Sequence, residues 1–272
     1  MRYTAGVRIG WLTDLHLNFL APWAQAAFYE QIREERLDAL LISGDIGDAE
    51  SVVSILSQFA AVVKVPVYFV LGNHDFYGGS MTGVRREIES LCAASEWLRW
   101  LPAVGVVSLT AGTALIGHDS WADGRCGDFE RSDVFLNDYR LVEEVTGLLK
   151  YQRLAKLNEL GDEAAQYLEV QARQALAKHK NVIVLTHVPP FREACWHEGR
   201  ISDNDYLPHF ACRVVGERLA AVMREHPFQG MDVLCGHTHG AGRVQVLDNL
   251  SVTTGGAEYG FPKLQSVIQP TG

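Results

Sequence analysis

Short apolar runs alternate with amphipathic segments at the start of this chain, and this alternation strongly limits the possible folds. The runs lie at residues 7–13, 39–43 and 65–71, and segments with helical spacing at 22–36 and 50–63 separate them. Short runs rich in β-branched and aromatic residues predict buried strands. Strand, helix, strand, helix, strand in this order predicts parallel strands joined by right-handed crossovers. The first part of the chain is therefore expected to form an α/β unit.

The pattern changes after a predicted helix near residues 82–97. Apolar runs at 105–109 and 113–117 are separated by only three residues, which predicts a hairpin, so part of the sheet system is antiparallel. Further strands are expected at 182–186, 231–235, 243–247, 250–254 and 265–268. Because neither an internal repeat nor a linker is found, we predict a single domain over residues 1–272.

Two more helical regions follow the hairpin. Residues 141–178 predict two helices with a break near Gly161-Asp162, and an amphipathic helix is expected at 210–225. Two long segments without periodicity, 118–139 and 191–208, are expected to be functional loops. Their aromatic residues either stack on a nucleobase or order the loops: Trp121, Phe129, Tyr139, Phe191 and Trp196.

Composition argues against several classes of protein. Hydrophobic residues make up 47% of the 272 residues, enough for a large core, and the net charge of −9 opposes a broad nucleic-acid surface. The five cysteines are scattered and never spaced C-x-x-C, so neither a disulfide framework nor a thiolate zinc site is indicated. Without a long apolar stretch or a signal-like N-terminus, we expect a cytoplasmic protein with no membrane partner.

Polar residues follow five of the predicted strands directly. They are Asp14, His16, Asp45, Asn73, His74, Asp75, His187, His237 and His239. The carboxyl ends of parallel strands meet at one edge of a sheet, where open α/β folds bind their ligands. A single histidine at a strand end is usually a hydrogen-bonded structural residue. Five strand ends that bear only oxygen and nitrogen ligands do not fit that explanation and indicate one shared site.

Imidazole and carboxylate groups without thiolate suit Mn, Fe, Zn, Co or Ni. Seven candidate ligands exceed the needs of one catalytic ion, which typically takes three protein groups plus water. Two ions about 3.5–4 Å apart are the simpler interpretation. Such a pair needs a shared ligand, and Asp45 is the predicted bridge. It follows the middle of the three N-terminal strands and is the only charged residue at that immediate strand exit.

The polar blocks, taken in order, resemble the calcineurin-like metallophosphoesterase superfamily. The blocks are D-x-H from Asp14, G-D-x-x-D from Gly44, G-N-H-D from Gly72, the lone His187, and G-H-x-H from Gly236. Each block alone is weak, but the ordered set across residues 14–239 is specific. The resemblance implies a two-sheet mixed β-sandwich flanked by helices, an α/β/β/α fold, with metals at the strand ends.

The resemblance further implies a ligand set for each of two divalent ions. The sets are Asp14, His16, Asp45 and His239 for one ion, and Asp45, Asn73, His187 and His237 for the other. Two divalent ions (+4) with Asp14 and Asp45 (−2) leave about +2, which attracts a phosphate ester into an acidic protein. The implied enzyme is a dinuclear phosphohydrolase that cleaves a small phosphate mono- or diester by attack of a metal-bridging hydroxide.

Three further residues receive predicted roles. His74 remains after the ligands are assigned, and the resemblance supports it as proton donor to the leaving group, a contribution typically of about 10² to 10⁴ in rate. Asp75 is predicted to orient that imidazole. Arg192, shortly after His187, is the best candidate to bind substrate phosphate in a bidentate manner. For Asp48 a helix cap is favoured over a ligand.

Other functions remain alternatives. The G-N-H-D pattern also occurs in class III cyclic nucleotide phosphodiesterases, so monoester and diester substrates are not separated. A protein phosphatase of this superfamily would normally have an arginine after the Asn-His block, where Phe76-Tyr77-Gly78-Gly79 stands instead. The net charge opposes a nuclease. A metal-binding scaffold that acts by partner contact would be expected to lose ligands, yet all seven are intact.

Overall fold

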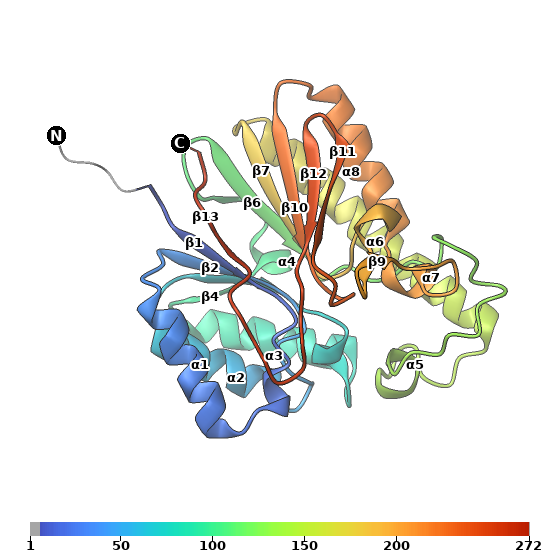
Figure 1. Cartoon of the computed structure of the whole chain (residues 1–272), viewed down its shortest axis with the longest axis horizontal. Coiled ribbons are helices and arrows are strands. Elements are labelled where there is room, and N and C mark those ends of the chain that lie inside the picture. The colour runs from blue at the N-terminus through green and yellow to red at the C-terminus, as the bar shows by residue number, and fades with distance from the viewer. Residues whose placement is uncertain (1–5, 272) are drawn as a thin grey trace.

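Two β-sheets packed face to face form the centre of the protein, and helices cover their outer faces (Figure 1). A computed structural model describes residues 6–271. The first sheet has the strand order β13-β1-β2-β3-β4, and the second has the order β11-β12-β10-β7-β6-β5. This arrangement confirms the predicted mixed two-sheet sandwich flanked by helices.

The first sheet is built from the predicted N-terminal alternation. Its four parallel strands are β1 (Ile9–Leu12), β2 (Ala39–Ser43), β3 (Val67–Val70) and β4 (Leu98–Trp100). Strand β13 (Ser266–Ile268) adds to β1 in the antiparallel direction. The helices on its outer face are α1 (Pro22–Glu34), α2 (Val52–Val63) and α3 (Met81–Ala94).

The second sheet has a parallel centre and antiparallel edges. The central strands are β6 (Thr113–His118), β7 (Asn181–Thr186), β10 (Gly230–Cys235) and β12 (Leu250–Thr254). The edge strands are β5 (Val107–Ser108) and β11 (Gly242–Leu247). The antiparallel β5–β6 pair confirms the predicted hairpin. Helices α6 (Lys150–Leu176) and α8 (Arg213–Glu225) cover the outer face.

The space between the sheets is filled by apolar side chains from both. Trp11 and Leu41 from the first sheet meet Leu115 and Ile183 from the second, and all four are buried. The Trp11 indole N–H donates to Ser43 Oγ at 3.0 Å, so its one polar group is satisfied. Because β2 is buried on both faces, it reads as a continuous apolar run in the sequence.

The predicted break near Gly161-Asp162 is wrong, because α6 continues through it. Gly161 is buried where the helix approaches the 118–139 loop. A Cβ at this position would lie 2.6 Å from the Asp123 Cβ and 3.4 Å from Cys212 Sγ. Glycine costs about 1 kcal/mol in a helix relative to alanine, and this close approach explains its presence. In a sequence, a glycine within a helical pattern is compatible with a helix break and with a close contact to another segment.

The two long loops, 118–139 and 191–208, have defined structure and are linked by hydrogen bonds. Short helices α5 (Asp138–Leu141) and α7 (Leu207–Phe210) lie in or directly after them. His209 joins the loops, because its Nδ1 lies 2.6 Å from the Tyr139 hydroxyl and its Nε2 lies 3.1 Å from Ser132 Oγ. Trp121, Phe129 and Tyr139 are buried, which favours the loop-ordering interpretation of these three aromatic residues.

The remaining elements are short. They are α4 (Leu101–Val104) and the two-stranded β8 (Trp196–His197) and β9 (Arg200–Ile201), with 3₁₀ turns η1 (Leu17–Phe19), η2 (His74–Phe76) and η3 (Arg192–Ala194). Within residues 6–271, no helix combines the length and the apolar character needed to cross a membrane.

Candidate metal centre

The carboxyl ends of five strands bring the predicted ligands to one place. Strands β1, β2 and β3 come from the first sheet, and β7 and β10 come from the second. One donor atom from each member of a first group lies within 4.8 Å of the others, and this group is Asp14, His16, Asp45 and His239. It is the set that the resemblance implied for the first ion.

The donors of this first group face one another closely. His16 Nε2 lies 3.1 Å from His239 Nε2 and 3.7 Å from Asp45 Oδ2, and His239 Nε2 lies 3.5 Å from Asp14 Oδ1. Burial lowers the pKa of His16 to about 2, so its imidazole is neutral. In the described part of the chain, its buried Nδ1 has no hydrogen-bond partner. Carboxylate oxygens and neutral imidazoles converging in a buried site fit a divalent cation.

A second group meets at the Asn73 side chain. Asn73 Oδ1 lies 2.8 Å from His187 Nε2 and 2.9 Å from His237 Nδ1. Asp45 Oδ1 lies 3.3 Å from His187 Nε2, whereas Asp45 Oδ2 faces His16 in the first group. Asp45 therefore presents one oxygen to each group, which is the arrangement that a bridging ligand requires.

Backbone carbonyls determine which imidazole nitrogen of the second group faces the site. His187 Nδ1 lies 2.9 Å from the Ser43 carbonyl and His237 Nε2 lies 3.1 Å from the His209 carbonyl. A carbonyl only accepts, so each of these nitrogens donates a proton to it. The opposite nitrogens, together with Asn73 Oδ1, are then available as metal donors. Carbonyl partners that fix the tautomer are typical of metal-binding histidines.

The electrostatics of the second group favour positive charge. Burial alone would lower the pKa of His187, but the Asp45 and Asp14 carboxylates outweigh it and raise that pKa overall. Burial also raises the pKa of Asp45 to about 7. The buried Asp45 carboxylate thus lacks sufficient counter-charge from the protein itself, and a divalent ion would supply it.

Several of these residues have strained backbone. The described chain contains nine non-glycine residues with positive φ, and five of them are predicted ligands: Asp14 (47°), His16 (44°), Asp45 (53°), His237 (70°) and His239 (60°). A left-handed conformation costs about 1–3 kcal/mol for such residues and concentrates at functional sites. The strain is consistent with side chains held in place for binding.

Glycines in the motifs make room for the ligands. A Cβ at Gly72 would overlap Asp45 Oδ1 and would lie 2.7 Å from His187 Cε1. A Cβ at Gly236 would overlap the Asp14 carboxylate. At these two positions glycine is therefore required by the close approach of backbone and ligand.

His74 borders the two groups. Its backbone N–H donates to Asp45 Oδ1 at 2.9 Å, and its Nε2 lies 4.0 Å from Asp45 Oδ2. The ring stacks on Tyr77 with centroids 4.2 Å apart, and its side chain remains 16% exposed. Burial lowers the pKa of His74 to about 4, and the Asp138 carboxylate opposes that shift. The ring is within reach of both the ligands and the solvent side.

The structure contradicts the predicted partnership between Asp75 and His74. Asp75 is fully buried, and its Oδ1 accepts from the backbone N–H groups of Ile46 and Gly47, both at 2.8 Å. Its Oδ2 accepts from Gly72 N–H, also at 2.8 Å. Asp75 therefore fixes the loop that follows Asp45 and does not orient the imidazole. Adjacent residues in a turn direct their side chains differently, which the sequence does not reveal.

Asp138 is a contributor that the sequence did not indicate. Its Oδ1 accepts from the Asn73 side-chain nitrogen at 2.9 Å and from the Tyr77 hydroxyl at 2.5 Å. These bonds identify which end of the Asn73 amide is nitrogen, so Oδ1 faces the two histidines. In the sequence Asp138 is one of several acidic residues at the end of a polar loop, and no local signal distinguishes it.

The structure gives no support to the predicted phosphate contact of Arg192. The residue is exposed in η3, and its guanidinium donates to Asn204 Oδ1 at 3.5 Å. It does not line either cavity beside His74. Asp48, in contrast, acts as a cap: its Oδ1 accepts from the Ser51 backbone N–H at 3.0 Å, directly before α2.

The comparison with protein families identifies the chain. The model of the family described as calcineurin-like phosphoesterase matches residues 7–241. The chain belongs to this family. It is therefore a hydrolase that acts on phosphate esters, in a family that depends on two metals, and its Asp and His cluster is able to bind metal.

Solved structures share the fold of this phosphoesterase. A dimetal phosphatase from Danio rerio is 18% identical with a TM-score of 0.57, and the match covers 91% of this chain and 86% of that one. Phosphopantetheinyl hydrolase from Mycobacterium tuberculosis is 14% identical with a TM-score of 0.63, covering 93% and 90%. At these identities the likeness shows the fold alone. No curated protein matches the sequence significantly.

Proposed function

We propose that this phosphoesterase is a dinuclear metal-dependent hydrolase of a small phosphate mono- or diester. The observation that supports this most is Asp45, whose two oxygens face separate groups of donors. The nitrogen and oxygen donor set, without thiolate, suits Mn, Fe, Zn, Co or Ni. When bound, two such ions supply Lewis-acid polarisation of phosphoryl oxygens and activation of water as the nucleophile.

The residues of the chain supply binding, charge balance and proton transfer. Asp14 and Asp45 are buried, so their negative charge attracts and holds cations more strongly than exposed carboxylates would. His74 lies beside Asp45 and is partly exposed, so it is the candidate to protonate the leaving-group oxygen. The neutral ring carries one N–H, which can form a hydrogen bond. It must gain a second proton before it can act as a general acid.

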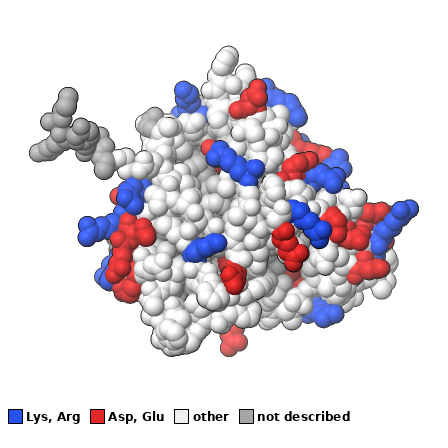
Figure 2. Space-filling model, viewed as in Figure 1, with Lys and Arg blue, Asp and Glu red and all other residues white. Residues whose placement is uncertain are grey.

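Small substrates fit the surface better than polynucleotides do. On the face shown in Figure 2, Lys and Arg are scattered among Asp and Glu. A cavity of about 770 Å³ beside His74 has the size of a small-molecule site. A cyclic nucleotide phosphodiester therefore remains a substrate candidate alongside monoesters, because the metal ligands serve both.

Hydrolysis by purified protein reconstituted with Mn²⁺ tests the proposal. The protein is expected to hydrolyse p-nitrophenyl phosphate or its bis-aryl diester, and the ratio of the two rates separates the ester classes. Asp45→Ala and His74→Ala are each expected to lower the rate at least about a hundredfold. Metal analysis of the same samples should show that Asp45→Ala loses metal and His74→Ala retains it.

Matched substitutions control for effects on folding. Asp248→Ala alters an exposed aspartate in the turn between β11 and β12, and His226→Ala alters a histidine at the end of α8. Both variants are expected to keep the wild-type rate. Unchanged activity in Asp45→Ala would overturn the assignment of the centre.

A further inference from the structure

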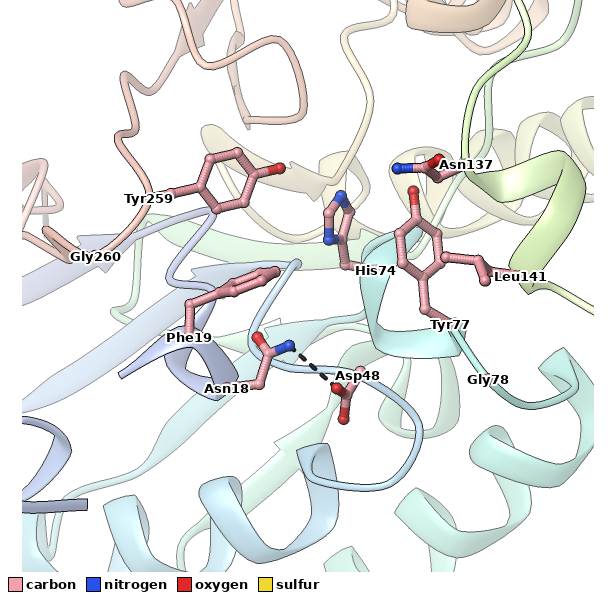
Figure 3. Close-up of a pocket in the computed structure, with 10 residues that line it drawn as sticks. All are labelled: Asn18, Phe19, Asp48, His74, Tyr77, Gly78, Asn137, Leu141, Tyr259 and Gly260. Carbon is pink, nitrogen blue, oxygen red and sulfur yellow. Dashed lines mark hydrogen bonds between the residues drawn. The ribbon is translucent and has the colours of Figure 1, made fainter. Parts of the chain in front are cut away.

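A cavity of about 770 Å³ opens beside His74 and adjoins the candidate metal centre (Figure 3). It shares His74, Tyr77, Asn137 and Tyr259 with a smaller cavity of about 280 Å³. The smaller cavity is also lined by several of the predicted ligands, including Asp45 and His239. A phosphate at the metal centre would therefore have the rest of its molecule in the larger cavity.

Aromatic rings form much of the wall of the larger cavity. In Figure 3, Phe19 and Tyr259 lie on one side and Tyr77 on the other, with His74 between them. The Phe19 and Tyr259 centroids are 5.3 Å apart, and Tyr259 lies 6.2 Å from His74. Phe19 is 59% exposed and Tyr259 is 47% exposed, so both have ring surface free for contact with a ligand. Such rings favour a flat, apolar partner.

The described residues of the cavity wall carry no cationic side chain. Among the described residues that line the two cavities, none is Lys or Arg. Asp48 is charged, but its Oδ2 accepts from the Asn18 amide and its Oδ1 from Ser51. Nearby Arg140 lies over the Phe135 ring at 5.3 Å. A second phosphate in this cavity would lack the cation that phosphate binding normally uses.

We infer that the substrate has one phosphate and a planar aromatic ring, a nucleobase or an aryl group, that packs against the exposed rings of Tyr259 and Phe19. This inference rests on the proposed function and specifies the substrate class of the same site. The cavity volume is sufficient for a nucleoside-sized group. The ring contacts select the leaving group, whereas the metal centre holds the phosphate.

Kinetics with the Mn²⁺-loaded enzyme test the inference. The substrates are adenosine 5′-monophosphate, cyclic adenosine monophosphate and phenyl phosphate, which have rings, glycerol 2-phosphate, which has none, and adenosine diphosphate. Tyr259→Leu and Phe19→Leu are each expected to lower kcat/KM for the ring-bearing substrates about fivefold, through KM. Phe19→Leu should leave the hydrolysis of glycerol 2-phosphate unaffected, and Tyr259→Phe, which keeps the ring that packs 4.5 Å from His16, should retain the wild-type KM. Adenosine and phenyl substrates distinguish a nucleobase site from a general aryl site.

A binding measurement separates this inference from the proposed function. Adenosine, followed by NMR line broadening, should bind more tightly than ribose, and Tyr259→Leu should weaken its binding. The exposed Tyr151 on α6 provides the control variant Tyr151→Leu, which should bind adenosine normally. Adenosine binding without hydrolysis of any ester would support the cavity and reject the proposed function. The inference would be overturned if the leucine variants lost kcat/KM equally for glycerol 2-phosphate and for the ring-bearing esters. It would also be overturned if the enzyme hydrolysed adenosine diphosphate with the same kcat/KM as the monophosphate.

Discussion

The side-chain nitrogen of Asn73 donates to Asp138 Oδ1 at 2.9 Å, and this bond directs Asn73 Oδ1 toward the two histidines of the second group. The Tyr77 hydroxyl donates to the same carboxylate oxygen. A residue of the long 118–139 loop thus positions a predicted ligand from the end of β3. Loss of such outer contacts typically costs about 10-fold to 100-fold in metal affinity.

Asp138→Ala should weaken metal binding at the second group. Without the carboxylate, the Asn73 amide nitrogen keeps only its 3.2 Å bond to the Tyr77 hydroxyl, and metal affinity is expected to fall about 10-fold to 100-fold. Competition with a chelator of known affinity measures this change. Asp133→Ala, an exposed aspartate in the same loop, is the matched control and should bind metal normally. Wild-type affinity in Asp138→Ala would show that Asn73 is held by other contacts.

Asp75→Ala should act mainly on the stability of the fold and less on the catalytic role of His74. The substitution leaves the buried N–H groups of Ile46, Gly47 and Gly72 without their acceptor, so the free energy of unfolding should fall by about 3 kcal/mol or more. Urea denaturation measures the loss. Asp75→Asn keeps one acceptor oxygen and should lose less. A fully stable Asp75→Ala protein with a slow reaction would instead support the partnership with His74.

Gly72→Ala should disrupt the centre through a single methyl group. The added Cβ overlaps Asp45 Oδ1, so the bridging carboxylate must move away from its place between the two groups. We expect reduced metal content and a rate about a hundredfold lower. Gly6→Ala provides the control, because nothing lies within 4 Å of a Cβ there. Full metal content in Gly72→Ala would show that the loop adapts to the methyl group.

Acid should destabilise the protein through His209. Burial, with Arg153 next, lowers the pKa of His209 to about 4, so the folded protein keeps this imidazole neutral between pH 6.5 and 4. The unfolded chain binds a proton in that window. The free energy of unfolding therefore decreases as the pH is lowered from 6.5 to 4, by at most about 3 kcal/mol. Urea denaturation at pH 7 and pH 4.5 should show a weaker pH dependence in His209→Gln. An identical dependence in both proteins would exclude His209 as the cause.

Residues at strand ends could be predicted from sequence because their position follows from local pattern. A buried strand is recognisable by composition, and hydrogen-bonded parallel neighbours bring the next residues to one edge. Asp14, Asp45 and Asn73 were found in this way, and the structure brings them together. The direction of each side chain was less accessible, as Asp75 shows, because it depends on backbone angles within a tight turn.

Residues in loops depended on tertiary structure. Asp138 and Tyr259 reach the site only because the 118–139 loop and the segment before β13 fold back over the strand ends. Likewise, the glycine at position 161 is explained by its close contact with Asp123, which is distant in sequence. The sequence by itself determined the strands, the family and the predicted ligands, since these follow from short-range pattern. Tertiary packing alone decided which loop residues position the ligands and shape the cavity, because those contacts join segments that no local pattern relates.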